Sequence, residues 1–99
     1  MPAIHSTIRV VLADDHPIVR SGIMKVLGRD PQIEVVGEAC DGNEALALVE
    51  SLQPDILLLD MEMPGVNGVE VTHQVRKRFP LVRILALSGY DDRAYIIEI

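Results

Sequence analysis

The sequence is poor in cysteine, in aromatic residues and in basic residues, and each shortage excludes a class of protein. A single cysteine rules out an internal disulfide and suits a reducing compartment. Nine Lys and Arg against fifteen Asp and Glu give a net charge of −6, which argues against a nucleic-acid-binding surface. The chain has no apolar window of ~20 residues that could span a membrane and no signal-peptide pattern at its start. We therefore predict a cytoplasmic protein that binds neither nucleic acid nor membrane through this chain.

The residues that are present can build one small aliphatic core. Hydrophobic residues make up 48% of the chain, with only one Phe, two Tyr and no Trp, so Val, Ile, Leu and Ala must fill the core. Ninety-nine residues are enough for one domain, and we assign residues 1–99 to it. We expect Cys40 to lie in this core as a small buried apolar residue.

Short apolar runs alternate with helical patterns along the chain. We predict strands over residues 8–13, 33–37, 56–60 and 82–87, with helices beginning at Pro17, Asp41 and Val69. A fourth helix is expected to start near Arg93, with Asp91 or Asp92 as its cap. Strands that alternate with helices over short connections predict an α/β fold, in which right-handed crossovers join the strands of a parallel sheet.

Two helix beginnings carry clear signals. Pro17 suits the first turn of a helix, where its missing N–H does no harm. Asp41 and Glu44 have the spacing of a capping box. In the first helix, apolar residues recur at spacings of three and four, and we expect this stripe to face the core: Ile18, Val19, Gly22, Ile23, Val26 and Leu27.

Acidic residues follow two of the predicted strands. Asp60 ends the apolar run Ile56–Leu59, and Asp14 and Asp15 come directly after the first strand. An unpaired carboxylate inside a hydrophobic core would be very unfavourable in free energy, so we expect Asp60 at the end of its strand. In open parallel sheets, ligands bind at the carboxyl ends of the strands. If the two strands are neighbours, three carboxylates converge on one site. We expect His16, in the loop before Pro17, to face solvent.

Carboxylates this close together need a cation in order to stay ionised, and Mg²⁺ prefers such oxygen ligands. We predict Asp15 and Asp60 as direct ligands, Asp14 acting through metal-bound water, and the backbone carbonyl of Glu62 as a further ligand. An aspartate can also attack phosphorus to form an acyl phosphate. Ser88, after the next strand, is placed to donate its hydroxyl to the new phosphoryl group.

Three motifs resemble those of a known family. VLADDHP at residues 11–17, LLLDMEMPGVNG at residues 57–68 and LSG at residues 87–89 are similar to the receiver domain of bacterial two-component response regulators. DDHPIVRSG at residues 14–22 is similar to the NarL/FixJ (LuxR-type) branch. The resemblance covers the whole chain, and the three motifs occur in the family's order.

The resemblance implies the flavodoxin-like (CheY-like) strand order 2-1-3-4-5, which makes the strands of Asp15 and Asp60 neighbours. It implies that Asp60 accepts a phosphoryl group from a sensor histidine kinase, with Mg²⁺ as cofactor and Ser88 as the switch hydroxyl. In the family, the residues at Glu62 and Tyr90 tune the lifetime of the phosphoryl group. The domain would be a switch that assists its own phosphotransfer and dephosphorylation, and the full-length protein would bind DNA through a C-terminal transcription-factor domain.

The match is incomplete near the end of the chain. The family carries an invariant lysine after a fifth strand, whereas Lys25 and Lys77 both fall in earlier helical patterns. We therefore expect the order 2-1-3-4 with the family's fifth strand, last helix and DNA-binding domain absent, and weak phosphorylation of Asp60. An uncovered sheet edge and helix surface would favour a homodimer or a swapped assembly.

Two other functions fit part of the pattern. A metal-dependent phosphohydrolase with an aspartyl nucleophile, such as a haloacid-dehalogenase-like enzyme, would use the same acids. That family requires Asp-x-Asp on the first strand, whereas this chain has adjacent Asp14 and Asp15. A phosphorylation-independent dimerisation module would explain the missing lysine. Sustained phosphate release would favour the enzyme, and stoichiometric labelling of Asp60 would favour the switch.

Overall fold

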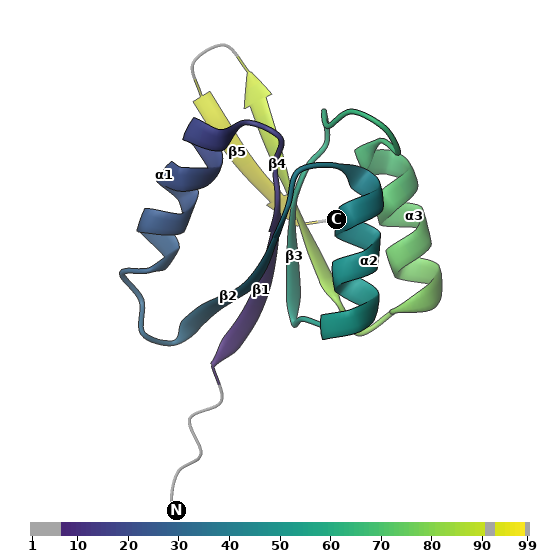
Figure 1. The fold of residues 1–99 in the computed structure, drawn as a ribbon, viewed down its shortest axis with the longest axis horizontal. Helices are drawn as coiled ribbons and strands as arrows, with labels where there is room; N and C mark the ends of the chain where they lie inside the picture. The colour runs from purple at the N-terminus through teal and green to yellow at the C-terminus, as the bar shows by residue number, and fades with distance from the viewer. Residues whose placement is uncertain (1–6, 91–92, 99) are drawn as a thin grey trace, which may run out of the picture.

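A computed structural model describes residues 7–90 and 93–98 of the chain (Figure 1). The elements are β1 (Ile8–Ala13), α1 (Pro17–Leu27), β2 (Ile33–Ala39), α2 (Gly42–Leu52), β3 (Ile56–Asp60), α3 (Gly68–Arg78), β4 (Arg83–Tyr90) and β5 (Arg93–Glu98). They form one sheet in the order β2-β1-β3-β4-β5, in which the first four strands run parallel. The predicted α/β fold and the order 2-1-3-4 are confirmed. Among the described residues, no helix has the length and apolar character needed to cross a membrane.

The segment after β4 is where the predicted secondary structure was wrong. Residues 93–98 form β5, a fifth strand antiparallel to β4, in place of the helix expected near Arg93. Antiparallel strands can be joined by about two residues, whereas a parallel return needs a crossover of about a dozen or more. The expected caps, Asp91 and Asp92, lie outside the described residues. Because β5 pairs with β4, the edge of β4 that was expected to be exposed has a partner.

The continuous apolar runs are buried because helices lie on both faces of the sheet (Figure 1). Successive residues alternate between these faces. Leu57 and Leu59 of β3 join Val11 of β1 in a core beneath α2 and α3. Leu58 and Leu12 point the other way, into a smaller core that is covered by α1.

The first helix covers its face of the sheet only in part. Of its predicted apolar stripe, Ile23 and Leu27 pack against the smaller core. Ile18 is 87% exposed, and Val19, Gly22 and Val26 are exposed as well, so the stripe is wrong for these four residues. An amphipathic pattern indicates which side of a helix is apolar but not what covers that side. In the described part of the chain, α1 lies on its face of the sheet with no second helix beside it, so part of its apolar side stays exposed (Figure 1). The expected homodimer stays a prediction.

The helices differ in how they begin. The side chain of Asp41 accepts a hydrogen bond from the N–H of Glu44 (2.7 Å), which confirms the predicted cap of α2. Asn67 caps α3 in the same way through the N–H of Glu70 (2.9 Å). His16, at the N-cap of α1, makes no such side-chain bond within the described structure.

Cys40 is exposed, so its prediction as a buried core residue was wrong. It lies where the chain leaves the sheet, between buried Ala39 and the helix cap Asp41, and its N–H donates to Oε1 of Glu44 (2.9 Å). The negative charge of Glu44 raises the pKa of the Cys40 thiol, with smaller contributions from burial and Asp41. The thiol is therefore exposed without being activated.

Candidate metal centre

The register of β1 and β3 determines which acidic residues meet. Ala13 pairs with Leu59 at the carboxyl ends of the two parallel strands, so Asp14 and Asp60 come next on neighbouring strands. Asp15 follows as the chain turns toward α1. Parallel pairing thus brings together residues that lie about 45 positions apart in the sequence, at the edge of the sheet where ligands of such folds bind.

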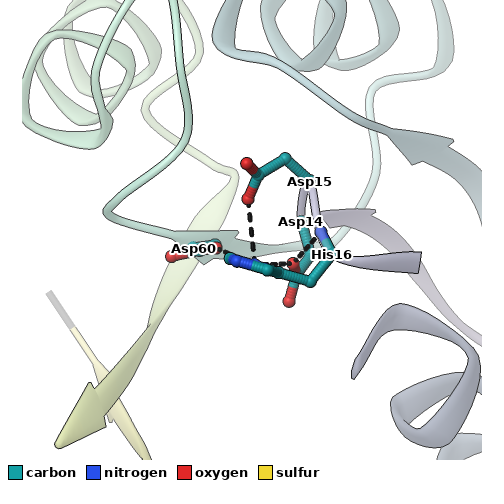
Figure 2. Close-up of side chains that lie close together, drawn as sticks. All are labelled: Asp14, Asp15, His16 and Asp60. Atoms are coloured by element: carbon teal, nitrogen blue, oxygen red, sulfur yellow. Dashed lines mark hydrogen bonds and ion pairs between the residues drawn. The ribbon is translucent and has the colours of Figure 1, made fainter. Parts of the chain in front are cut away.

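The side chains of Asp14, Asp15, His16 and Asp60 form one cluster (Figure 2). One potential ligand atom from each residue lies within 4.8 Å of those of the others. The structure therefore brings together the three acids that the sequence singled out, and it adds a histidine to them. Asp14 and Asp60 are buried, at 2% and 8% exposure.

The electrostatics of the cluster are those of negative charge held away from water. Burial raises the pKa of the Asp60 carboxyl, and the charges of Asp14 and Asp15 raise it further, against the opposing effect of the N–H of Glu62. Oδ1 of Asp15 is buried and accepts no hydrogen bond in the described structure, although Nδ1 of His16 lies 3.0 Å from it. A buried carboxylate oxygen without a hydrogen bond is unfavourable unless a proton or a cation approaches it. Three carboxylates with an unsatisfied oxygen fit a hard divalent cation.

His16 is the site residue whose role the sequence did not reveal. Its side chain is 62% exposed, as expected of a loop residue, yet Nδ1 faces the acids (Figure 2). Nδ1 lies 3.2 Å from Oδ1 of Asp14, 3.0 Å from Oδ1 of Asp15 and 3.7 Å from Oδ2 of Asp60. The hydrogen bond with Asp14 and the charge of Asp15 raise the pKa of His16. The available signal was its position directly after two aspartates.

Neighbouring groups hold the cluster in position. Arg20 of α1 donates from Nη1 to the backbone oxygen of Asp14 (2.6 Å) and from Nε to Oε1 of Glu38 (3.1 Å). It thereby ties α1 to the ends of β1 and β2, a role that sequence reasoning missed. The N–H of Glu62 donates to Oδ1 of Asp60 (2.9 Å), which fixes the carboxylate at the start of the loop after β3.

The loop after β3 is packed closely against α2. A Cβ added to Gly42, the first residue of α2, would meet the backbone oxygen of Val66. One added to Gly68 would lie 2.6 Å from the Cα of Met61. Only glycine fits at these two positions. The close contacts of Gly42 with Val66 and of Gly68 with Met61 fix the path of the loop that carries Glu62.

The predicted switch hydroxyl can be placed only through the backbone. Leu87 of β4 pairs with Asp60 of β3, so Ser88 comes one residue after the position opposite Asp60. The side chains of Ser88 and Tyr90 lie outside what the structure describes. Lys25 and Lys77 fall in the last turns of α1 and α3, whereas Asp14 and Asp15 precede the first turn of α1.

Comparisons with known proteins agree with this geometry. The family model for the response regulator receiver domain matches residues 10–99. The chain is 42% identical over 92 residues to the transcriptional regulatory protein DegU of Brevibacillus brevis, covering 93% of this chain and 39% of that protein. It spans about two fifths of the length of the curated relatives it matches.

Solved structures give the same result. The signal receiver domain of NarL from Mycobacterium tuberculosis is similar with a TM-score of 0.82 and 42% identity, over 87% of this chain and 69% of that one. The isolated receiver domain of RcsB from Salmonella enterica serovar Typhimurium, solved in the presence of the phosphomimetic BeF3-, has a TM-score of 0.80 and 31% identity, over 87% of this chain and 64% of that one.

Proposed function

Because this chain belongs to the family of response regulator receiver domains, of the NarL/LuxR type, we propose that Asp60 accepts a phosphoryl group from a sensor histidine kinase. The observation that carries the proposal is the position of Asp60 at the carboxyl end of β3, within one cluster with Asp14 and Asp15. An aspartate in this position has both a route for a phosphodonor and the negative surroundings that require a cation.

The transfer asks little of the protein beyond alignment and charge neutralisation. A carboxylate oxygen of Asp60 attacks phosphorus and forms a new O–P bond. The P–N bond to the kinase histidine breaks, and its electron pair returns to the imidazole. The Glu62 N–H on Oδ1 of Asp60 holds the nucleophile in a fixed orientation for this step.

The proposed cofactor is Mg²⁺, which when bound supplies positive charge to the carboxylates and the phosphoryl oxygens. Asp15 and Asp60 would hold it directly, Asp14 through a water molecule, and the backbone carbonyl of Glu62 as a further ligand. Oδ1 of Asp15 supports this assignment, because it is a hard oxygen donor that accepts no hydrogen bond in the described structure.

The output of the switch is proposed to run through Ser88. Its hydroxyl donates to the phosphoryl group, and the resulting movement of β4 regulates a C-terminal transcription-factor domain of the longer protein. The support is the pairing of Leu87 with Asp60, together with the similarity of the chain to transcriptional regulatory proteins.

Mass spectrometry of the intact protein after incubation with acetyl phosphate and Mg²⁺ tests the proposal. We expect the wild type to gain one phosphoryl group, and Asp60→Asn to gain none because the nucleophilic oxygen is replaced by an amide. The matched control is Asp55→Asn, at the other end of the same strand, where an amide oxygen can still accept the N–H of Arg9. This control should label like the wild type.

A mass gain that survives Asp60→Asn would overturn the assignment of the phosphoacceptor. Continuous release of phosphate over many turnovers, without accumulation of labelled protein, would instead favour the aspartyl phosphohydrolase. Omitting Mg²⁺ should abolish the labelling, because the clustered carboxylates then repel the phosphodonor.

A further inference from the structure

The solvent-facing side of α3 carries an open hollow beside positively charged side chains. It has a volume of about 520 Å³, and five residues line it: Val69, Thr72, His73, Arg76 and Lys77. These residues are spaced three and four apart, so they form one continuous stripe along the helix. All but Thr72 are exposed. The hollow is therefore a positively charged surface on a chain whose net charge is −6.

Three consecutive cations end α3, and the fold uses one of them. Arg78 donates from Nη2 to Oε1 of Glu50 on α2 (2.8 Å), and its guanidinium lies 5.0 Å from the centre of the Phe79 ring. Arg76 and Lys77 have no ion pair and no side-chain hydrogen bond to any residue that the structure describes. The positions three and four residues before each of them hold no acid, so the helix offers neither cation a neighbour of opposite charge.

The other end of the hollow is apolar. Val69, in the first turn of α3, is 70% exposed. The hydroxyl of Thr72 donates to the backbone oxygen of Gly68 (2.7 Å), which leaves its methyl group for a partner. The acidic residue of α3, Glu70, accepts a hydrogen bond from Nε2 of Gln74 (3.1 Å). A favourable interaction with the helix dipole accounts for cations in the last turn, but it does not account for an exposed aliphatic side chain in the first.

The chemistry of the hollow favours one class of partner. Nucleic acids are bound by longer basic stripes that follow the phosphate backbone, and membranes by a broad apolar helix face. A protein segment that carries an aliphatic side chain and, one turn further, carboxylates is complementary to both ends of the hollow. A stripe with spacings of three and four is also the surface on which a second helix packs.

A second copy of this chain does not offer such a segment on its described helices. α1 contains no acidic residue. The glutamates of α2 and α3 each have a hydrogen-bond or ion-pair partner already: Glu44, Glu50 and Glu70. The complementary helix therefore has a different sequence from α1, α2 and α3.

We propose that this side of α3 is a docking surface for an acidic amphipathic helix of a partner protein. The aliphatic residue of that helix packs against Val69 and the methyl group of Thr72, and its carboxylates pair with Arg76 and Lys77. Because these pairs are exposed to solvent, salt weakens the association. The proposal is independent of the phosphoacceptor, since none of the lining residues belongs to the acidic cluster.

Fluorescence anisotropy with a labelled acidic peptide tests the proposal. The probe is a peptide of about 15 residues, long enough to form a helix on the surface, with Leu and, one turn further, two Glu on one face. The comparison probe has Gln in place of both Glu. We expect the Glu probe to bind the wild type with an affinity that falls as salt is added, and the Gln probe to bind about fivefold more weakly or worse.

Matched variants locate the binding surface. Arg76→Gln should weaken binding of the Glu probe by about two- to fivefold, as the loss of one exposed ion pair does. Arg78→Gln removes the same charge from the same turn, but on the side that pairs with Glu50, and should leave the affinity unchanged. Val69→Ser should weaken binding by about fivefold through lost apolar contact, whereas Ile18→Ser, an exposed aliphatic position on α1, should not.

Several outcomes would overturn the proposal. Equal weakening by Arg76→Gln and Arg78→Gln would mean that the probe is attracted to the helix end without a defined surface. Binding of a DNA duplex or of phosphatidylserine vesicles more tightly than the Glu probe, and lost in Arg76→Gln, would assign the hollow to a phosphate-bearing partner. Self-association that Arg76→Gln abolishes in sedimentation equilibrium would assign it to a second copy. Failure of the Glu probe to bind the wild type would also contradict the proposal.

Discussion

The two faces of the sheet differ in how completely helices cover them. Beneath α2 and α3, the described core includes twelve buried residues, from Val11 to Ile84, drawn from strands, helices and loops. On the α1 side the corresponding cluster has four, all from the strands, and none of the residues of α1 is fully buried. The chain therefore has one well-packed half and one lightly covered half.

The acidic cluster draws on both halves. Asp60 and the loop after it are fixed against α2 through the contact of Gly42 with Val66, on the well-packed face. Asp14 and His16 lead into α1, on the lightly covered face, and are held mainly by hydrogen bonds. This difference indicates that Asp60, the proposed phosphoacceptor, is positioned by tight packing, whereas the residues beside it on the first strand depend on the start of a more loosely held helix.

The largest expected difference between the faces comes from one pair of neighbours in β3. Leu57 is fully buried under α2 and α3, and Leu58 is nearly as buried on the α1 side. Leu57→Ala should lower the free energy of unfolding by about 4 kcal/mol, and Leu58→Ala by about 2–3 kcal/mol, because the neighbours of Leu58 can relax into the space. Urea denaturation measures both. Equal losses would show that the α1 face is packed as tightly as the other.

A smaller contrast is expected from two helical glycines. Gly42→Ala would press a methyl group against the backbone of Val66, and we expect it to lower the free energy of unfolding by about 1–3 kcal/mol. At Gly22 of α1, an added Cβ meets no described atom within 4 Å, so Gly22→Ala should raise that free energy by roughly 0.5–1 kcal/mol through helix propensity alone. Thermal or urea unfolding of the two variants checks both signs. A destabilising Gly22→Ala would mean that α1 is covered at that point.

Much of the well-packed half could be predicted from the sequence, because its signals are local. The apolar run before Asp60 predicted the strand that β3 forms, and the spacing of Asp41 and Glu44 predicted the beginning of α2. The convergence of Asp14, Asp15 and Asp60 followed from the rule that parallel strands present their carboxyl ends at one edge.

The remaining features depend on partners that a sequence pattern does not contain. The run near Ile96 has no decisive period, and it becomes a strand through pairing with the edge of β4. The stripe of α1 marks an apolar side without saying what covers it, so Ile18 and Val26 were misassigned. His16 is predicted as a loop residue from its neighbours, and its distance to Asp60 arises only when β1 and β3 pair.

The position of a bound divalent ion tests the central claim most directly. Crystals of the protein grown with Mn²⁺ as a substitute for Mg²⁺ would locate the ion by its anomalous scattering. The account predicts one ion in contact with Asp15 and Asp60, at the edge of the sheet where β1 and β3 end. An ion bound elsewhere, with Asp60 remote from it, would contradict the account.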